Sequence, residues 1–389
     1  IVVYYFNRIP IISLVTNLVV IPLIGIVLAY GFTSIFFAFI YFPIGELFAV
    51  TNSLCIKILL NIINTASEFQ FSSFDVFSVG LVSILLYYFC LWIILNLHQP
   101  AFRKIAIFAI LIAANFILWK SILWQPKWLT VTFFDVGQGD AAFIEFPDGK
   151  NMLIDAGPKV SDFDVGKYVL VPYFKRFGIH RINTIILSHA DNDHIGGMPA
   201  ILRHIKADHL YDAGLYHQTR ICSTYQFLID SLKLNYHQVG DCFRMKEFQT
   251  AGCFLLHPTD DFLNNYTKDI NDNSLVLKIV YGDTEFLFTG DIEKQAEEYL
   301  TRYGRLLEAD VLKIAHHGSK TSSSKEFLKE LNPQIAIISC GRNNPYHYPH
   351  LSVLRRLEES GIKILRTDQK GDIKIVSDGN YLNIKSNYK

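Results

Sequence analysis

Charged side chains are scarce in the first third of this 389-residue sequence. Only six of the 36 Lys and Arg residues and three of the 36 Asp and Glu residues precede residue 129. Repeated apolar runs with so little charge are hard to solvate. The scarcity therefore favours membrane-spanning helices over the alternative, a set of buried core helices in a soluble protein.

Four apolar stretches are long enough to cross a hydrocarbon core of about 30 Å, which takes about 20 helical residues. We expect these spans at approximately Ile11–Tyr30, Phe32–Val50, Phe77–Leu97 and Ile105–Trp124. The shorter stretch Leu54–Ile63 contains a lysine, and we expect it to be interfacial or re-entrant.

Basic residues predict an orientation. The connection His98–Lys104 contains two basic residues and no acid, which is typical of a cytoplasmic loop. In a multi-pass protein of the cell (inner) membrane, the loop Thr51–Val76 and all residues after 128 are then expected outside the cytoplasm. Arg8 falls on the outer side too and disagrees weakly. Because the sequence begins at Ile1, inside an apolar run, we expect a fragment or a truncated reading frame.

An excess of charge of one sign is also lacking after residue 128, where 30 basic and 33 acidic residues nearly balance. This balance excludes a broad basic surface, so any binding of nucleic acid must use a local site. The six cysteines do not have the spacing of metal ligands. A location outside the cytoplasm would permit one disulfide among Cys222, Cys242 and Cys253.

Residues 129–389 have the pattern of a mixed α/β domain. Short β-rich runs first form hairpins and then alternate with helical stretches, twice over, which suggests two sheets sandwiched between helices. A helix is expected to start near Gly197, and others at Glu293–Tyr303 and Ser352–Ser360. The expected strands are Thr130–Asp135, Ala141–Phe146, Asn151–Asp155, Ile182–Ser188, Ser274–Tyr281, Glu285–Thr289, Val311–Ala315, Ile335–Ser339, Ile362–Arg366 and Asp372–Val376.

Potential metal ligands gather directly after the strand Ile182–Ser188. Four of them lie within six residues, in the segment His189-Ala-Asp191-Asn-Asp193-His194. These side chains cannot all share one face of a strand or helix, whereas a tight loop at the end of a strand can direct them inward. Imidazole and carboxylate together suit Zn²⁺, Mn²⁺ or Fe. A metal site is therefore favoured over a surface loop.

This segment resembles the His-x-His-x-Asp-His signature of the metallo-β-lactamase superfamily, with an aspartate in place of the second histidine. Together with four further motifs it resembles the ComEC family of DNA-internalisation competence proteins. The resemblance implies the end of a membrane competence region at residues 1–128 and a metallo-β-lactamase domain, a four-layer αββα sandwich, at 129–389. The further motifs are Asp135-Val-Gly-Gln-Gly-Asp140, Leu153-Ile-Asp155-Ala-Gly157, Phe288-Thr-Gly-Asp291 and His316-His317-Gly318-Ser319.

The resemblance also implies a role for each ligand. Two divalent ions, Zn or Mn, are expected, one held by His189 and Asp191 and the other by Asp193 and His194, with Asp291 as the bridging carboxylate. The remaining residues have assisting roles: His316 or His317 as a further ligand or general acid, Asp155 as a residue that orients the metal loop by hydrogen bonding, and Asp140 in the same role or as part of a structural turn.

Two departures from the family pattern stand out. The usual third metal histidine is absent from the segment Asp269–Ser274, a loss that the ComEC family shares. The second departure is Tyr348, which stands where the family usually places a histidine before proline. A shift of the loop by one residue could let His347 serve as the ligand instead.

We expect a membrane protein of DNA uptake whose helices contribute to a channel for single-stranded DNA. Its outer domain would hydrolyse phosphodiesters of the strand that is not transported, with activity dependent on Asp193. The expected partners are DNA, membrane lipid and other competence proteins. Two alternatives stay open: an outer domain that binds DNA with little catalysis, and an anchored metallohydrolase of a small phosphoester. Lys320, Lys325 and nearby serines either contact DNA phosphates or begin a solvated helix.

Overall fold

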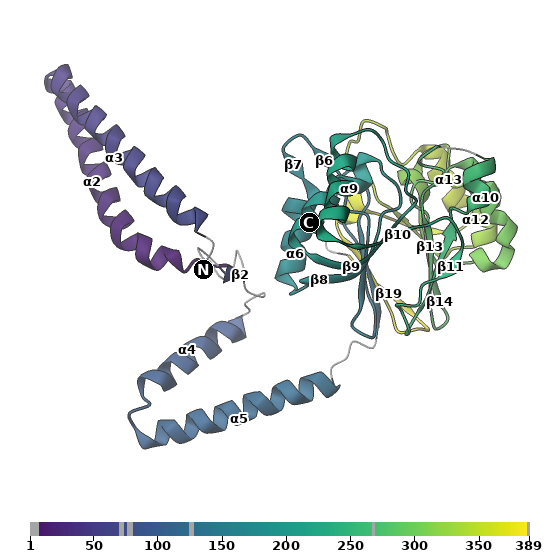
Figure 1. The fold of residues 1–389 in the computed structure, drawn as a ribbon, viewed down its shortest axis with the longest axis horizontal. Coiled ribbons are helices and arrows are strands. Elements are labelled where there is room, and N and C mark those ends of the chain that lie inside the picture. Colours follow the sequence, from purple (N-terminus) through teal and green to yellow (C-terminus); the bar gives the residue numbers. More distant parts are fainter. Residues whose placement is uncertain (1–7, 70–73, 76–80, 124–127, 267–268, 387–389) are drawn as a thin grey trace. The chain divides into compact units, whose positions relative to one another are not determined.

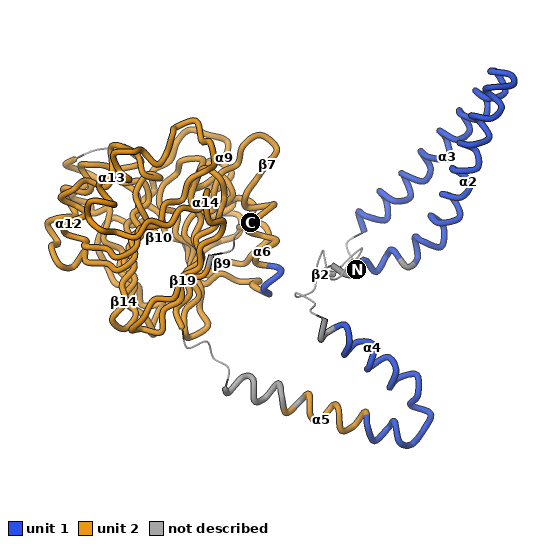
Figure 2. Tube along the Cα trace, turned by 180° about the vertical axis from the view of Figure 1, so that it is seen from behind, with its two compact units in different colours: residues 1–105, 175–178 blue, residues 106–174, 179–389 orange. Residues whose placement is uncertain are grey.

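The computed structural model describes residues 8–69, 74–75, 81–123, 128–266 and 269–386 (Figure 1). The chain divides into two compact units, residues 1–105 with 175–178 and residues 106–174 with 179–389 (Figure 2). The division falls inside a helix, α5 (Pro100–Leu123). The predicted domain boundary between residues 128 and 129 therefore stays a prediction.

The helices at the start of the apolar first part have other bounds than the sequence suggested. Residues predicted as the first span and about half of the second form one helix, α2 (Ile12–Ile40). The chain breaks at Tyr41, whose backbone is extended (φ −153°, ψ 106°), and α3 (Phe42–Glu68) begins with Pro43 in its first turn. Proline lacks the N–H that an unbroken helix needs, but is tolerated in a first turn. The separate spans Ile11–Tyr30 and Phe32–Val50 are therefore wrong.

Leu54–Ile63, predicted as interfacial or re-entrant, is instead a continuous part of α3. Val15–Ile40 and Phe42–Glu68 are long and apolar enough to cross a membrane. The two later predicted spans extend into residues outside the described ranges. Their described parts form α4 (Leu81–Leu95) and α5.

The helices α2 and α3 pack against each other as a hairpin near the break at Tyr41 (Figure 1). A side chain at Gly45 would meet the backbone of Ala38 at 2.5 Å, so only glycine permits this approach. Further along the hairpin, the rings of Phe37 and Phe48 stack with their centroids 5.4 Å apart. Small residues at close helix contacts are typical of helices that associate in membranes.

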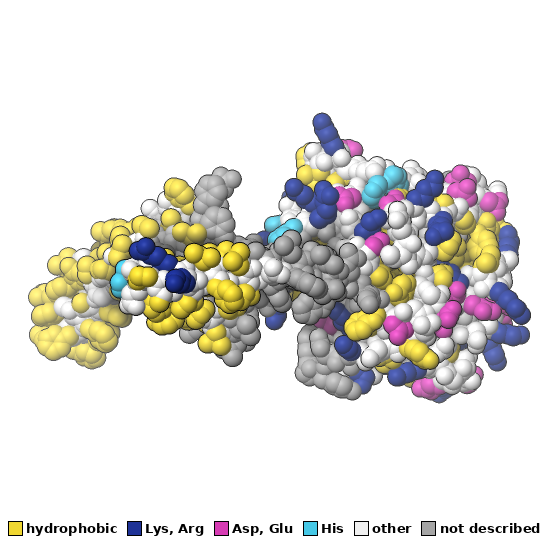
Figure 3. Space-filling view, turned by 90° about the horizontal axis from the view of Figure 1, so that it is seen from below, with side chains coloured by type: hydrophobic (Ala, Val, Ile, Leu, Met, Phe, Trp, Pro, Cys, Tyr) yellow, Lys and Arg dark blue, Asp and Glu magenta, His cyan; other side chains and the backbone are white. Residues whose placement is uncertain are grey.

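The two parts of the chain differ in surface chemistry. The visible face of the helical part consists largely of hydrophobic side chains, whereas acidic and basic side chains are scattered over the visible face of the globular part (Figure 3). Large apolar side chains such as Leu18, Phe39 and Leu95 are more than two-thirds exposed. Water solvates such surfaces poorly, so the helices need an apolar environment.

Two mixed sheets form the globular part. The first has the order β10-β9-β8-β5-β4-β3-β18-β19 and the second the order β11-β12-β13-β14-β15-β16-β17. The strands of the first sheet, in this order, are Asn235–Gln238, Lys206–Asp212, Arg181–Ile186, Asn151–Ile154, Ala142–Glu145, Leu129–Phe133, Ile373–Ser377 and Leu382–Ser386. Those of the second are Phe243–Arg244, Gly252–His257, Val276–Tyr281, Thr284–Phe288, Val311–Lys313, Ile335–Ile338 and Lys363–Arg366.

Three apolar cores separate four layers. One core lies between the sheets and contains Phe133 and Phe288, whose rings are 5.7 Å apart. A second core joins the first sheet to its helices, and a third joins the second sheet to the remaining helices (Figure 1). This confirms the predicted αββα sandwich. The helices are α6 (Val171–Arg176), α7 (Asn192–Ile195), α8 (Met198–His204), α9 (Arg220–Leu232), α10 (Asp260–Asn265), α11 (Lys294–Leu300), α12 (Lys325–Leu331), α13 (Leu351–Glu359) and α14 (Thr367–Lys370), with a small hairpin of β6 (Lys159–Val160) and β7 (Phe163–Asp164).

All ten predicted strands of this part are present with small shifts in their ends. The strands that were not predicted from the sequence are β6, β7, β9, β10, β11, β12 and β19. β9 and β10 are rich in polar residues because one end of the first sheet is only partly covered. The alternation of apolar and polar residues that marks a half-buried strand is therefore weak there.

The disulfide that the sequence would permit is not formed in the structure, in which all six cysteines are free. Cys222 lies in the core between the first sheet and its helices, whereas Cys253 lies in the core between the two sheets. Cys242 is half-buried, and its sulfur contacts the carbonyl oxygen of Leu256 at 3.0 Å. Cysteines in separate cores do not meet without rearrangement of the sheets.

Parallel strands bring the predicted motifs to one edge of the sandwich. β5 and β8 are parallel in the first sheet, and β14, β15 and β16 are parallel in the second. Asp155, His189, Asp291, His317 and Ser339 each follow the carboxyl end of one of these strands. The carboxyl ends of parallel strands are where α/β folds place their ligand sites.

Candidate metal centre

The loop that follows β8 is fixed by a single carboxylate. Asp155 accepts a hydrogen bond from the backbone N–H of Ser188 (2.7 Å) and one from the Ser188 hydroxyl (2.7 Å). Its Oδ2 also lies 2.8 Å from Nδ1 of His194. Asp155 itself has a left-handed backbone (φ 58°), an unusual conformation for aspartate. The carboxylate thus orients the His194 ring through its Nδ1 atom.

Two glycines let the loops approach each other at backbone distance. A side chain at Gly139, whose φ is 142°, would meet the carbonyl oxygen of Asp193 at 2.3 Å, and one at Gly197 would meet that of Ala156 at 2.3 Å. The N–H of Asp140 donates to the same Asp193 carbonyl (3.1 Å). Both positions therefore require glycine for the loops to pack this closely, and the close packing brings Asp140 into the site.

Four buried side chains converge on one point. Asp140, His194, Asp291 and His317 each offer a ligand atom, and these atoms all lie within 4.8 Å of one another. Oδ2 of Asp291 is 3.4 Å from Nε2 of His194 and 3.3 Å from Nε2 of His317. All four residues are at most 5% exposed. The cluster joins residues that are up to 177 positions apart in the sequence.

The two histidines present the same ring atom to the cluster. Nδ1 of His317 lies 2.9 Å from the carbonyl oxygen of Ser339, as Nδ1 of His194 lies against Asp155. A hydrogen-bond acceptor next to Nδ1 favours the tautomer that carries its proton on Nδ1. The lone pair on Nε2 is then available to a ligand. This is the arrangement typical of histidines that bind metals.

The other predicted ligands surround this cluster at different distances. Oδ2 of Asp193 is 3.2 Å from Nε2 of His317. His189 is buried with its ring 4.0 Å from that of His194, and its Nε2 lies 3.7 Å from Oδ2 of Asp191. Asp191 is about one-third exposed at the edge of the site. These residues lie close to the four-residue cluster but do not belong to it.

The neighbouring histidines at 316 and 347 are placed differently. Nδ1 of His316 lies 3.0 Å from Oε1 of Glu293, at the partly exposed rim. His347 is exposed, and the ring that lies against the histidines is that of Tyr348, 6.4 Å from His317 and 5.6 Å from His316 between centroids. The structure therefore brings His317 into the cluster, and it leaves His316 and His347 outside it.

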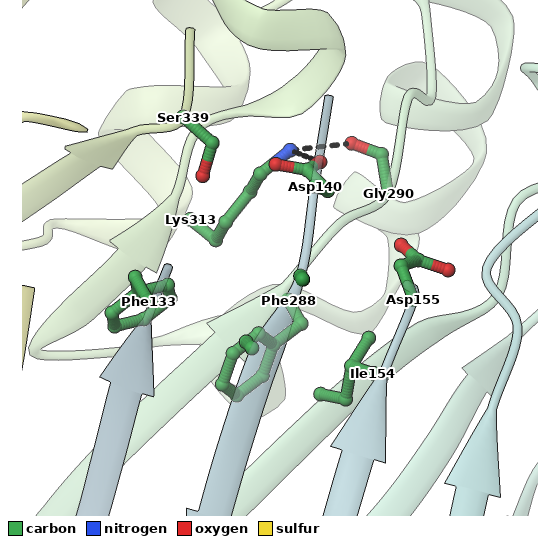
Figure 4. Close-up of a pocket in the computed structure, with 10 residues that line it drawn as sticks. Phe133, Asp140, Ile154, Asp155, Phe288, Gly290, Lys313 and Ser339 are labelled. Carbon is green, nitrogen blue, oxygen red and sulfur yellow. Dashed lines mark hydrogen bonds and ion pairs between the residues drawn. The ribbon is translucent and has the colours of Figure 1, made fainter. Parts of the chain in front are cut away.

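Two residues of the site were not predicted from the sequence. The ammonium group of Lys313, on β15, makes an ion pair with Asp140 (Figure 4). The same group lies 3.8 Å from Oδ1 of Asp291. His217, in the loop before α9, places Nε2 2.6 Å from Oδ1 of Asp191. No sequence motif marked either residue. Lys313 stands in an apolar strand, where a lysine normally indicates a face turned to solvent.

The segment that lacks the third metal histidine supports the turn at Asp291 instead. The Ser274 hydroxyl accepts a hydrogen bond from the N–H of Asp291 (3.1 Å). Oδ1 of Asp272 accepts one from the N–H of Glu293 (2.7 Å). These bonds fix the turn between β14 and α11. The residues that replace the histidine thus orient Asp291 and Glu293.

Burial and charge act in opposite directions on the protonation of the cluster. Burial lowers the pKa of His317, but the carboxylates of Asp291 and Asp140 raise it to about 10. Burial would raise the pKa of Asp291, yet His317 and His194 hold it well below the usual value. Without a metal, protonated histidines thus balance the carboxylates.

The donor set fits a divalent metal ion. Nε2 of His189 and Oδ1 of Asp291 are buried and have no hydrogen-bond partner among the described residues. A buried polar atom without a partner is costly, and a cation would compensate both atoms. Imidazole nitrogen and carboxylate oxygen are ligands for Zn²⁺ and Mn²⁺.

Comparisons with known proteins agree with this architecture. Residues 1–103 match the family described as Competence protein, and residues 134–226 and 269–342 match the Metallo-beta-lactamase superfamily. The chain joins a region that matches the competence-protein model to a domain with the metallo-β-lactamase fold. It is 30% identical over 395 residues to ComE operon protein 3 of Bacillus subtilis, an alignment that covers 96% of this chain and 49% of the relative. It is 32% identical over 287 residues to Recombination protein 2 of Haemophilus influenzae, covering 72% of this chain and 34% of that protein.

A third relative is Competence protein ComA of Neisseria gonorrhoeae, 32% identical over 269 residues, which are 68% of this chain and 34% of that protein. The chain spans about half, or less, of the length of these relatives. The resemblance to competence proteins seen in the sequence is confirmed. The metallo-β-lactamase match covers the cluster residues, since Asp140, His194, Asp291 and His317 all lie within its two segments.

A carboxylate outside the cluster gives the domain a pH-dependent contact. Glu297, on α11, is fully buried and accepts hydrogen bonds from the backbone N–H groups of Ser323 and Ser324. Burial raises its pKa to about 7, from an ordinary value of 4.5. Because the pKa of Glu297 is higher in the folded domain than in the unfolded chain, protonated Glu297 favours the folded state. This contribution to the free energy of unfolding is full below pH 4.5 and is lost as the pH rises towards 7.

We therefore expect the thermal midpoint of unfolding of the Glu297→Gln variant to fall less than that of the wild type as the pH rises through this window. Differential scanning fluorimetry at a series of pH values measures the slope. Glu298→Gln, on the exposed side of α11, is the matched control and should keep the wild-type slope. Equal slopes for wild type and Glu297→Gln would contradict the assignment.

Proposed function

We propose that this chain is part of a DNA-uptake protein of the cell membrane and that its metallo-β-lactamase domain is a metal-dependent phosphodiesterase acting on DNA. Two findings support the proposal: the match to competence proteins and the buried cluster of Asp140, His194, Asp291 and His317. The cluster carries the enzymatic part, because buried imidazole and carboxylate groups that converge on one point suit a metal ion rather than a DNA-binding surface.

The proposed ligands divide into two groups. The four cluster residues would hold one divalent ion, with Asp193 beside them. His189 and Asp191, with His217 beside Asp191, would hold a second ion, and Asp291 would face both. Bound ions would supply a Lewis acid that polarises a phosphodiester and lowers the pKa of water. Lys313 would keep the charge of Asp140 balanced.

His316 is proposed to deliver a proton to the leaving oxygen. Its Nδ1 contacts Glu293 at 3.0 Å, and Glu293 also accepts a hydrogen bond from the Thr321 hydroxyl (2.7 Å). These contacts hold the ring at the partly exposed rim, where substrate can reach its other nitrogen. A histidine held in this way is suited to general acid catalysis.

The helical part is proposed to cross the membrane several times and to contribute to a passage for single-stranded DNA. The basic connection around Arg103 and Lys104 would lie in the cytoplasm, which places the metallo-β-lactamase domain outside. The domain would then meet duplex DNA on arrival and degrade the strand that does not enter. Membrane lipid and other competence proteins are the further partners we propose.

A nuclease assay on the full chain in detergent tests this function. With Mn²⁺ or Zn²⁺ present, we expect cleavage of end-labelled single- or double-stranded DNA that stops when the metal is chelated. Asp193→Ala should reduce cleavage, whereas Asp283→Ala, in an exposed turn, should not. Binding of DNA without cleavage would favour a non-catalytic domain, which the tyrosine at 348 also favours. Turnover of small phosphoesters alone would favour the anchored hydrolase.

A further inference from the structure

The loop between β16 and α13 forms a fixed arch beside the metal centre. The buried side chain of Asn344 donates hydrogen bonds to the carbonyl oxygens of Gly341 (2.9 Å) and Tyr348 (2.6 Å). Its Oδ1 accepts one from the N–H of Tyr348 (2.9 Å). At the end of the arch, the N–H of His350 donates to the carbonyl oxygen of Gly318 (2.9 Å). The arch is therefore tied both to itself and to the loop that carries His317.

Two tyrosine rings on this arch form a row that leads outward from the cluster. The ring of Tyr348 is inclined by 26° to that of His317, at 6.4 Å between centroids. The ring of Tyr346 is nearly parallel to that of Tyr348, inclined by 20° at 5.6 Å. Tyr348 is half-buried, and Tyr346 is 59% exposed. The outer ring thus presents an aromatic surface to solvent a short distance from the site of proposed hydrolysis.

We propose that Tyr346 and Tyr348 are a stacking platform for a nucleobase next to the phosphodiester at the metal centre. The inference rests on the proposed function and adds the chemistry that distinguishes the substrate. Aromatic side chains that stack on bases bind single-stranded nucleic acid with little sequence preference. A row of rings held by an internal hydrogen-bond network loses little freedom when it receives a base.

The charge around the arch agrees with a nucleic acid rather than an apolar partner. Lys320 is exposed directly after the loop of His317, and the half-buried His350 lies beside Tyr348, with 6.3 Å between ring centroids. A lysine on the loop that is hydrogen-bonded to the arch, together with an exposed aromatic ring, suits a ligand with both phosphates and bases. The chain is nearly neutral overall, so recognition of DNA needs a local site of this kind.

The position of the Tyr348 ring suggests a role for the tyrosine that replaces the family's histidine. A histidine there would offer a metal ligand, whereas the phenol ring extends the row of parallel faces. Tyrosine in place of histidine at this position thus provides a surface for the substrate instead of a ligand for the metal. This predicts a preference for base-bearing strands over backbones without bases.

Binding of two labelled oligonucleotides of equal length tests the platform. One carries thymine at every position and the other is abasic, and the full chain in detergent is used with the metal chelated so that cleavage cannot interfere. Fluorescence anisotropy gives the ratio of the two dissociation constants. We expect the wild type to bind the thymine strand about tenfold more tightly, which corresponds to one stacked base.

Tyr346→Ala should bring this ratio close to one, and Tyr346→Phe, which keeps the ring, should restore it. Tyr381→Ala, an exposed tyrosine in the turn between β18 and β19 at the opposite end of the sandwich, should leave the ratio unchanged. A ratio near one in the wild type, or a ratio that Tyr346→Ala does not change, would overturn the platform. A preserved ratio without any metal-dependent cleavage would contradict the proposed function alone.

Discussion

Replacing Asp291 by asparagine is expected to abolish metal retention and to lower the rate of DNA hydrolysis by more than about 100-fold, since even residues outside the ligand shell cost 10–100-fold in metal affinity or activity. The carboxylate lies 3.4 Å from His194 and 3.3 Å from His317, at the centre of the cluster. An amide has nearly the same shape, but it carries no charge and only one oxygen. Elemental analysis after dialysis and the cleavage assay measure the two effects.

The matched control for this variant is Asp283→Asn in the exposed turn between β13 and β14. Circular dichroism distinguishes the loss of a ligand from the loss of the fold, because the secondary structure of Asp291→Asn should match the wild type. Wild-type metal content and wild-type cleavage in a folded Asp291→Asn protein would show that the cluster is not the metal centre.

The second large effect is expected for Lys313→Met. The ammonium group is fully buried, and it pairs with Asp140 and Asp291. Removing one member of a buried ion pair leaves a charge without compensation, which costs about 3–5 kcal/mol. A bound divalent cation supplies positive charge at the same point, so the cost should be largest in the metal-free protein.

Differential scanning fluorimetry with and without metal measures this coupling. Metal should raise the thermal midpoint of Lys313→Met by more than it raises that of the wild type. Lys374→Met, which removes an exposed lysine 3.8 Å from Glu145, should respond to metal as the wild type does. Equal metal-induced shifts in Lys313→Met and the wild type would mean that Lys313 does not contribute to the electrostatics of the site.

Much of the fold of the second part can be predicted from the sequence because its central strands are buried on both sides. Runs such as Ile335–Ile338 are continuously apolar and are bounded by polar residues, which is a clear signal. β10, at the edge of the first sheet, and its neighbour β9 have no such signal. The first part shows a different failure, since apolar composition predicts a membrane helix but does not say where one helix ends. Pro43 follows the break at Tyr41, but Pro22 lies inside α2 without ending it, so proline alone does not mark the end of a helix.

The site could be predicted in part for a related reason. Ligands that follow one another in the sequence, such as Asp193 and His194 of α7, are visible as a motif. Residues that reach the site through pairing of distant strands are not: Lys313 is on the second sheet and meets Asp140, which is in the loop between β3 and β4 of the first. The choice between His316 and His317 depended on left-handed backbone conformations at both residues, which no local pattern indicates.

X-ray absorption spectroscopy of the metal-loaded full chain identifies the ligands of the bound ion. We expect coordination by nitrogen and oxygen atoms, with the more distant scattering of at least two imidazole rings from His194 and His317. In the Asp291→Asn variant this signal should disappear. A stoichiometric metal with sulfur ligands, a shell of water without imidazole, or the same spectrum in the variant would contradict this expectation.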